Sequence, residues 1–181
     1  TFRSHIDGSE HRFNPEVSMK VQHQIGADII FAFDELTTLI DSREYQEESL
    51  EKRTHPWALR SLEAHNQLTA GQPQKPYQAL YGVVQGAQYE DLRRQSARYL
   101  ANLDFDGFGL GGALTKDGLG EIVGWMTDEL PEEKPRHMLG ISEPEDIFIC
   151  IENGADTFDC VSPARVARNG ALYLPTGRFN I

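Results

Sequence analysis

The sequence predicts an α/β fold in which helices cover a parallel sheet. Short apolar runs of strand length recur along the 181 residues, helical patterns separate them, and each run ends at or near a polar residue or a glycine. About five strand–helix units of this kind indicate parallel strands joined by helical crossovers. A partial (β/α)8 barrel and a doubly wound open sheet both fit this pattern, although five strands cannot close an eight-stranded barrel.

The amino-terminal region predicts one helix and then the first strand. Asn14 and Pro15 are typical of a helix start, with Asn as the capping residue and Pro at the first helical position. Gly26 is expected to end the helix. The face predicted to be buried carries Val17, Val21 and Ile25. Residues 28–33 are apolar on both faces, so they predict a buried parallel strand that ends at Asp34.

The remaining elements follow in order. Residues 44–68 are charged and helix-rich, and Pro56 indicates a fresh helix start or a kink. A turn cluster covers residues 71–76. Four further strands are predicted at residues 77–84, 105–110, 137–141 and 156–161. The helices between them are predicted at residues 89–103, at 119–130 and from Ser142 to Gly154, where Ser-Glu-Pro-Glu is typical of a capping box.

Composition limits the classes of partner. The formal net charge of −11 argues against nucleic-acid binding by bulk electrostatics, so any such contact needs a local basic patch or polypeptide outside this chain. Cys150 and Cys160 are too few for a disulfide framework and favour a reducing compartment such as the cytoplasm. No run approaches about 18 apolar residues, so no membrane span is expected. The first residues read like the middle of a longer chain.

Several polar residues and glycines are predicted to meet at one edge of the sheet. The carboxyl ends of parallel strands lie together, and in a (β/α)8 barrel they form the active site. The residues that follow the predicted strands are Asp34, Gln85, Gly111 with Gly112, Gly140, and Asp159. A doubly wound sheet would cluster them in a similar way.

Three of these positions are suited to a purine-like base. The Asp34 carboxylate can accept two hydrogen bonds from adjacent ring and amino N–H groups, and the Gln85 amide can both donate and accept. The backbone around Gly112 and Ala113 can approach a flat ligand closely. Taken singly, Asp34 could cap a helix, Gln85 could bridge backbone groups and the glycines could merely turn the chain. Their position at successive strand ends favours a binding site.

Asp159 is the candidate nucleophile. It ends a short apolar run, and Arg165 and Arg168 follow six and nine residues later. Nearby cations would hold the carboxylate ionised and could also bind a phosphodiester. A carboxylate can form a covalent intermediate at a sugar anomeric carbon. The alternative is a structural ion pair between Asp159 and one of the two arginines.

Other patterns are set aside. Residues 107–112 match G-x-G-x-x-G, but the glycines alternate within a predicted strand and no helix opens through the motif, so no nicotinamide or flavin site is expected. The six histidines lack metal-ligand spacing and no C-x-x-C occurs, so no metal site is expected within this chain. The acidic residues 44–51 are interpreted as a solvated helix face.

Six motifs connect the sequence to a known family. They are Ser4-His5-Ile6-Asp7-Gly8-Ser9, Phe33-Asp34-Glu35, Val84-Gln85-Gly86, Gly111-Gly112, Leu139-Gly140, and Phe158-Asp159-Cys160-Val161 followed by Arg165 and Arg168-Asn169-Gly170. In these motifs and in their order the chain resembles the tRNA-guanine transglycosylases, also called queuine tRNA-ribosyltransferases. The resemblance covers essentially the whole chain.

The resemblance implies a TIM barrel that exchanges guanine at the tRNA wobble position for a 7-deazaguanine base. It assigns the nucleophilic attack on ribose C1′ to Asp159 and anticodon-loop contacts to Arg165 and Arg168. It also implies five residues that contact the base: Asp34, Gln85, Gly112 and Leu139 bind the ring, and Ala113 meets the substituent on the 7-position. No nucleotide cofactor is implied.

The resemblance also implies missing parts. A second catalytic aspartate and a zinc site of three cysteines and a histidine belong to the family but fall outside these residues. Residues 1–181 are therefore expected to form a single, incomplete TIM-barrel domain that is inactive alone and homodimeric when full length. Leu36, the loop from Ala113 to Asp117 and Glu143 depart from the common pattern. Queuine and its aminomethyl precursor both remain candidates for the incoming base.

Two other classes of function fit less well. A non-catalytic tRNA-binding partner subunit would not need Asp34, Gln85 and Asp159 together. A barrel glycosidase or small-molecule lyase would leave Arg165 and Arg168 unexplained.

Overall fold

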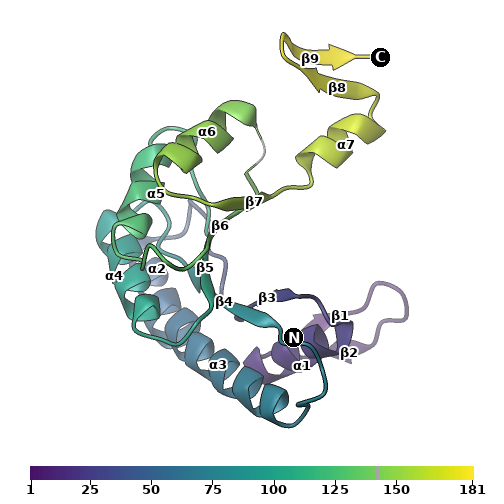
Figure 1. The fold of residues 1–181 in the computed structure, drawn as a ribbon, viewed down its shortest axis with the longest axis vertical. Coiled ribbons are helices and arrows are strands. Elements are labelled where there is room, and N and C mark those ends of the chain that lie inside the picture. Colours follow the sequence, from purple (N-terminus) through teal and green to yellow (C-terminus); the bar gives the residue numbers. More distant parts are fainter. Residues whose placement is uncertain (142) are drawn as a thin grey trace.

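Five parallel strands form one curved sheet in the computed structural model, which describes residues 1–141 and 143–181. The strands are β3 (Ile29–Phe31), β4 (Ala79–Val84), β5 (Gly107–Leu110), β6 (Arg136–Leu139) and β7 (Thr157–Asp159). Their spatial order follows the sequence without reversal, and the helices lie on the outer side of the sheet (Figure 1). This half-barrel confirms the partial (β/α)8 barrel and rules out the doubly wound sheet, which would need a reversal of strand order.

The helices and hairpins complete the architecture. The helical elements are α1 (Pro15–Ile25), α2 (Arg43–Ser49), the π-helical turn η1 (Leu50–Thr54), α3 (His55–Ala70), α4 (Glu90–Ala101), α5 (Leu119–Thr127), α6 (Pro144–Glu152) and α7 (Ser162–Arg168). Two hairpins lie near the ends of the chain: β1 (Phe2–Arg3) with β2 (Glu10–His11), and β8 (Ala171–Leu174) with β9 (Gly177–Asn180). Helix α7 and the β8–β9 hairpin extend away from the sheet (Figure 1). No helix in the described residues is both long enough and apolar enough to cross a bilayer.

Alternation along the strands separates two faces of the sheet. Ile30, Leu80, Phe108, Leu110 and Met138 are at most 2% exposed and pack in the core against the helices. Their sequence neighbours point to the opposite, concave face, because successive strand residues alternate. The concave face therefore carries Phe31, Tyr81, Val83, His137, Leu139 and Asp159, together with Gly107 and Gly109 of β5 and Gly111, which follows it.

Helix α1 begins and ends where the sequence predicts. The Asn14 side chain accepts a hydrogen bond from the Val17 N–H at 2.8 Å, and Gly26 has a φ of +78° at the carboxyl end. The predicted buried face was wrong, since Ile25 is 74% exposed and Val17 and Val21 are only half-buried. The buried residues of α1 are Pro15, Ser18, Met19 and His23.

A buried histidine pair explains the rotated face of α1. His23 Nε2 lies 3.0 Å from His65 Nδ1 on α3, so two polar side chains satisfy each other between the two helices. A search for apolar periodicity cannot find a face that is buried through such a pair.

The helical stretch after β3 breaks at Pro56, as predicted. Proline lacks an N–H and its ring crowds the carbonyl four residues earlier, so the preceding turn widens into the π-helical turn η1. This turn holds the segment that follows β3. Thr54 Oγ1 accepts a hydrogen bond from the Glu35 N–H at 3.3 Å, and Arg53 pairs with the Glu35 carboxylate.

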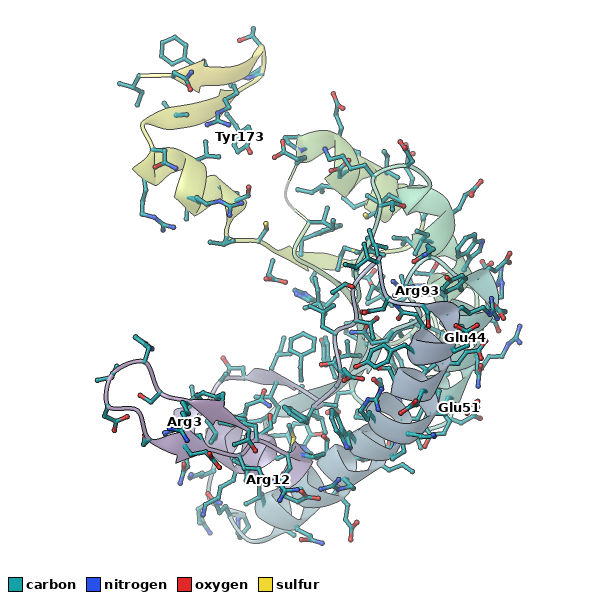
Figure 2. All side chains as sticks on the ribbon, turned by 180° about the vertical axis from the view of Figure 1, so that it is seen from behind. Arg3, Arg12, Glu44, Glu51, Arg93 and Tyr173 are labelled. Carbon is teal, nitrogen blue, oxygen red and sulfur yellow. The ribbon has the colours of Figure 1, made fainter. Side chains whose placement is uncertain are left out.

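Two other predictions concern helix caps and surface charge. The predicted capping residue Ser142 lies outside the described residues; α6 begins at Pro144, and the side chain of Glu143, at its N-cap position, makes no capping hydrogen bond. Glu44 and Glu51 are exposed on the outer helices, as Figure 2 shows, which agrees with the interpretation of residues 44–51 as a solvated face.

One fully buried arginine ties the ends of β4 and β5 to helix α4. Arg93 is 0% exposed and lies between the helices and the sheet (Figure 2). Its guanidinium donates to the carbonyl of Ala87 at 2.7 Å and to the carbonyls of Val84 and Gly111. Burial lowers the pKa of Arg93 to about 9, so the group remains charged at neutral pH. A charge held by backbone carbonyls fixes the loops that carry Gln85 and Gly112.

Replacing Arg93 by Met is expected to destabilise the protein by about 3 kcal/mol, because buried carbonyls would lose their donor. Urea unfolding of the full-length protein that contains this chain measures the loss. Arg94→Met is the matched control, since Arg94 makes surface ion pairs with Glu90, Asp128 and Glu129 and should cost less than about 1 kcal/mol. Equal losses for the two variants would contradict this role.

Candidate active site

Asp34 and Gln85 meet directly at the carboxyl edge of the sheet. The β3–β4 ladder continues past β3 through a hydrogen bond of 2.9 Å from the Ala32 N–H to the Tyr81 carbonyl. This pairing brings the two strand ends together, and Gln85 Nε2 donates to Asp34 Oδ2 at 2.6 Å. The two residues that the sequence placed at successive strand ends are therefore in contact.

Burial dominates the electrostatics of Asp34. Desolvation raises the pKa of Asp34, the hydrogen bond from Gln85 lowers it, and the nearby Glu35 charge raises it slightly. No cation pairs with this carboxylate in the part of the chain that the structure describes. A ligand that donates N–H groups would therefore stabilise the ionised form of Asp34.

Among the described residues, Gln85 keeps a buried acceptor without a partner beside Gly112. Gln85 is 4% exposed, and its Oε1 atom has no hydrogen-bond partner within residues 1–141 and 143–181. Gly112 has a φ of +93°, and a Cβ atom there would lie 2.8 Å from Gln85 Oε1 and 2.7 Å from the Arg93 guanidinium. Only glycine fits this position, and the buried Gln85 acceptor is an unsatisfied polar group that needs a donor.

The other two residues expected around the base lie nearby in the fold. Ala113 follows Gly112 in the loop after β5 and is half-buried. Leu139 ends β6 and is half-buried on the concave face, where its Cδ1 atom lies 3.3 Å from the position of a Cβ at Gly109. Leu139 thus extends, with Phe31, over the glycine at position 109 of β5.

Asp159 ends β7 at the same edge of the sheet as Asp34. It is exposed, and the β6–β7 register pairs it with Leu139. Its Oδ1 atom lies 3.1 Å from His137 Nε2 and accepts a hydrogen bond from the Gly140 N–H at 3.3 Å. His137 is the functional candidate that the sequence did not identify.

The alternative of a structural ion pair between Asp159 and Arg165 or Arg168 is not found within the described part of the chain. Arg165 and Arg168 are exposed on α7, and no ion pair joins either of them to Asp159 among the described residues. The chain turns after β7, and α7 packs against the β8 strand of the outlying hairpin. The two arginines therefore lie on the extension, where a large ligand could reach them.

A small cavity lies beside Asp159. It encloses about 230 Å³ and is lined by the loop after β5, the loop after β6 and the start of α7, including Thr115, Lys116, Gly140, Cys160 and Arg165. A larger cavity of about 610 Å³ lies between the β8–β9 hairpin and the start of α6. There the Tyr173 hydroxyl, visible in Figure 2, donates to Glu143 at 3.1 Å.

The described residues contain no cluster of metal-binding side chains. No group of three or more His, Cys, Asp or Glu side chains in residues 1–141 and 143–181 is placed to hold a metal ion. The residues present therefore do not form a zinc site, and no step is assigned to zinc.

The comparison with known proteins identifies the family. The sequence profile of queuine tRNA-ribosyltransferases matches residues 1–181, the whole of the chain. The chain belongs to the queuine tRNA-ribosyltransferase family. It is 44% identical over 184 residues to the queuine tRNA-ribosyltransferase of Herpetosiphon aurantiacus, covering 100% of this chain and 45% of the relative.

Further members of the queuine tRNA-ribosyltransferase family are similarly close. The protein of Roseiflexus sp. is 46% identical over 179 residues, which cover 96% of this chain and 44% of the relative. The protein of Lactococcus lactis is 42% identical over 183 residues, which cover 99% of this chain and 46% of the relative. The chain thus spans a little under half the length of the curated relatives it matches.

Asp34→Asn is expected to stabilise the ligand-free protein at neutral pH. Burial raises the pKa of Asp34 in the folded state, so the folded protein binds a proton there more tightly than the unfolded chain. The stability of the wild type therefore falls as pH rises from the ordinary carboxyl value of 3.8 through the raised pKa. The uncharged amide removes this loss while it still accepts from Gln85.

Urea unfolding of the full-length protein between pH 4 and pH 7.5 measures the difference. The Asn variant should be more stable at pH 7.5, with the gain shrinking towards pH 4. The exposed Asp104, changed to Asn, provides the control and should show no gain. An Asp34→Asn variant that is less stable than the wild type at pH 7.5 would contradict a desolvated carboxylate.

Proposed function

We propose that this chain supplies the nucleophile and part of the base pocket of a tRNA-guanine transglycosylase. The enzyme replaces guanine at the anticodon wobble position with a 7-deazaguanine base, through a covalent bond between aspartate and ribose. The observation that supports this best is the contact between Asp34, Gln85 and Gly112 at the edge of the sheet that also carries Asp159. Family membership supports the same reaction.

The base pocket matches the hydrogen-bonding edge of guanine. The Asp34 carboxylate accepts from the ring N–H and the amino group, and the strong desolvation of Asp34 favours a ligand that offers both donors. Gln85 is joined to Asp34 and places its free acceptor beside Gly112. The base ring lies against the glycine backbone with Leu139 beside it, and Ala113 faces the 7-position.

The exchange takes two displacements at one carbon. In the first, a lone pair of the Asp159 carboxylate forms a bond to ribose C1′, the C1′–N9 bond breaks, and its electron pair leaves with guanine. In the second, N9 of the incoming base attacks C1′, the bond from Asp159 breaks, and the carboxylate is regenerated. Guanine gains the proton that the incoming base loses, so atoms and charge balance. Two inversions retain the configuration at C1′.

The tRNA contacts are assigned to Arg165 and Arg168. Both are exposed on α7, and neither is paired with a carboxylate within the described residues. Free guanidinium groups are suited to bidentate contacts with phosphate, so they provide the local basic surface that a chain of net charge −11 requires.

The proposal also extends to the rest of the protein. We assign the second catalytic aspartate, the zinc ligands and the homodimer contacts of the full-length enzyme to polypeptide outside these 181 residues. On this view residues 1–181 are one incomplete barrel domain. Queuine and its aminomethyl precursor both remain candidates for the incoming base.

The covalent intermediate provides the test. Full-length protein incubated with tRNA and run on a denaturing gel should show a shifted band, and Asp159→Asn should abolish it because an amide is a far weaker nucleophile. Asp156→Asn is the matched control: Asp156 lies before the start of β7, pairs with Arg136 at 3.4 Å, and should leave the band unchanged.

Two results would count against the proposal. Binding of tRNA by the wild type with no shifted band would favour a non-catalytic partner subunit. A shifted band that persists in Asp159→Asn would remove the nucleophile assigned here.

A further inference from the structure

Three side chains on the concave face form a continuous hydrogen-bonded row. Thr157 and Asp159 project from β7, and His137 projects from β6 between them, since the register pairs His137 with Thr157 and Leu139 with Asp159. His137 Nδ1 lies 2.8 Å from Thr157 Oγ1, and His137 Nε2 lies 3.1 Å from Asp159 Oδ1. The histidine thus bridges a hydroxyl and the candidate nucleophile.

The partners of His137 select one arrangement of its proton. A carboxylate oxygen only accepts, so a bond to Asp159 requires a proton on Nε2. In neutral imidazole Nδ1 is then the acceptor, and the Thr157 hydroxyl is the group that can donate to it. The Asp159 carboxylate therefore selects the tautomer in which His137 donates to it, and the Thr157 hydroxyl can donate to the remaining Nδ1 acceptor.

The donors to Asp159 make its two oxygens inequivalent. His137 Nε2–H and the Gly140 N–H both donate to Oδ1. Within residues 1–141 and 143–181 no hydrogen bond reaches Oδ2. One oxygen is held by two donors from β6 and its following loop, and the other is open to a ligand.

The imidazole ring is held in place from the opposite side of the half-barrel. The Phe31 ring, from β3, lies with its centroid 5.6 Å from that of His137 and 5.6 Å from that of Tyr81. It reaches across β5 because Gly109 has no side chain there; a Cβ at Gly109 would lie 3.0 Å from Phe31 Cε1. His137 is only 16% exposed at its side chain, whereas that of Asp159 is 61% exposed.

We propose that His137 is a positioning residue that anchors Oδ1 of Asp159 and so directs Oδ2 to ribose C1′, an inference that rests on the proposed transglycosylase function. During attack the Oδ2 lone pair forms the bond to C1′ and Oδ1 becomes the carbonyl oxygen of the ester. His137 Nε2–H and the Gly140 N–H continue to donate to that oxygen. When the incoming base breaks the C1′–Oδ2 bond, the same donors stabilise the returning carboxylate charge.

A replacement for His137 must keep an N–H donor at the position of Nε2 if the hydrogen bond to Asp159 is to remain. Leu fills the space without a donor, whereas the amide N–H of Gln can reach the position of Nε2–H. Thr157→Val keeps the shape of Thr157 but removes the hydroxyl that can donate to Nδ1 of His137. The three variants separate the donor from the volume of the side chain.

The test measures incorporation of labelled guanine into tRNA, and the rate at which the covalent band forms, with the full-length enzyme. His137→Leu should lower kcat by about 10- to 100-fold with little change in the KM for guanine, the effect of one lost hydrogen bond to a charged group. His137→Gln should restore most of the rate, and Thr157→Val should lower kcat by a smaller factor than His137→Leu. The midpoints of thermal unfolding show whether each variant is folded.

The outcomes distinguish the two proposals. If the wild type forms no covalent band, the transglycosylase function fails. If the wild type forms the band and His137→Leu forms it at the same rate, the positioning role of His137 is overturned. Equal losses of kcat in the Leu and Gln variants, with unchanged unfolding midpoints, would overturn the role of the Nε2–H donor.

Discussion

The absence of side chains from the concave face of β5 is the constraint on which the site depends. Gly107, Gly109 and Gly111 point to this face, and Cβ atoms there would lie 2.6 Å from the Tyr81 ring, 3.0 Å from the Phe31 ring and 2.7 Å from Val83. The side chains of neighbouring strands therefore extend over β5. Phe31 of β3 reaches His137 of β6 in this way, and His137 contacts the candidate nucleophile Asp159.

Two charges are buried at the strand ends, and they act differently. Arg93 donates through Nε and Nη1 to carbonyls of the loops after β4 and β5 and fixes them in place. Asp34 has one neutral donor, Gln85, and its raised pKa reflects a desolvation cost that the ligand-free protein does not offset. A rigid loop framework around an under-solvated carboxylate is the arrangement expected of a site that binds a donor-rich base. The desolvated Asp34 carboxylate thus lowers the stability of the ligand-free protein and is also the group that would bind the base.

Local signals predicted the strand ends and several caps. Asn14 and Gly26 act through bonds within a few residues, so spacing alone located α1, and Pro56 located the break before α3. Asp34 and Gln85 could be paired because parallel strands share a carboxyl edge. His137, Arg93 and the buried face of α1 were missed, because each depends on partners from other elements: the β6–β7 register, carbonyls of two loops, and His65 on α3. The separation of Arg165 and Arg168 from Asp159 likewise depends on the direction of the chain after β7.

A crystal structure of the full-length protein with guanine bound tests the central claim most directly. The account predicts that the Asp34 carboxylate accepts from the guanine ring N–H and amino group, that the ring lies against Gly111 and Gly112, and that N9 faces Asp159. Guanine bound in the cavity between the β8–β9 hairpin and α6, with Asp34 free of it, would contradict the account.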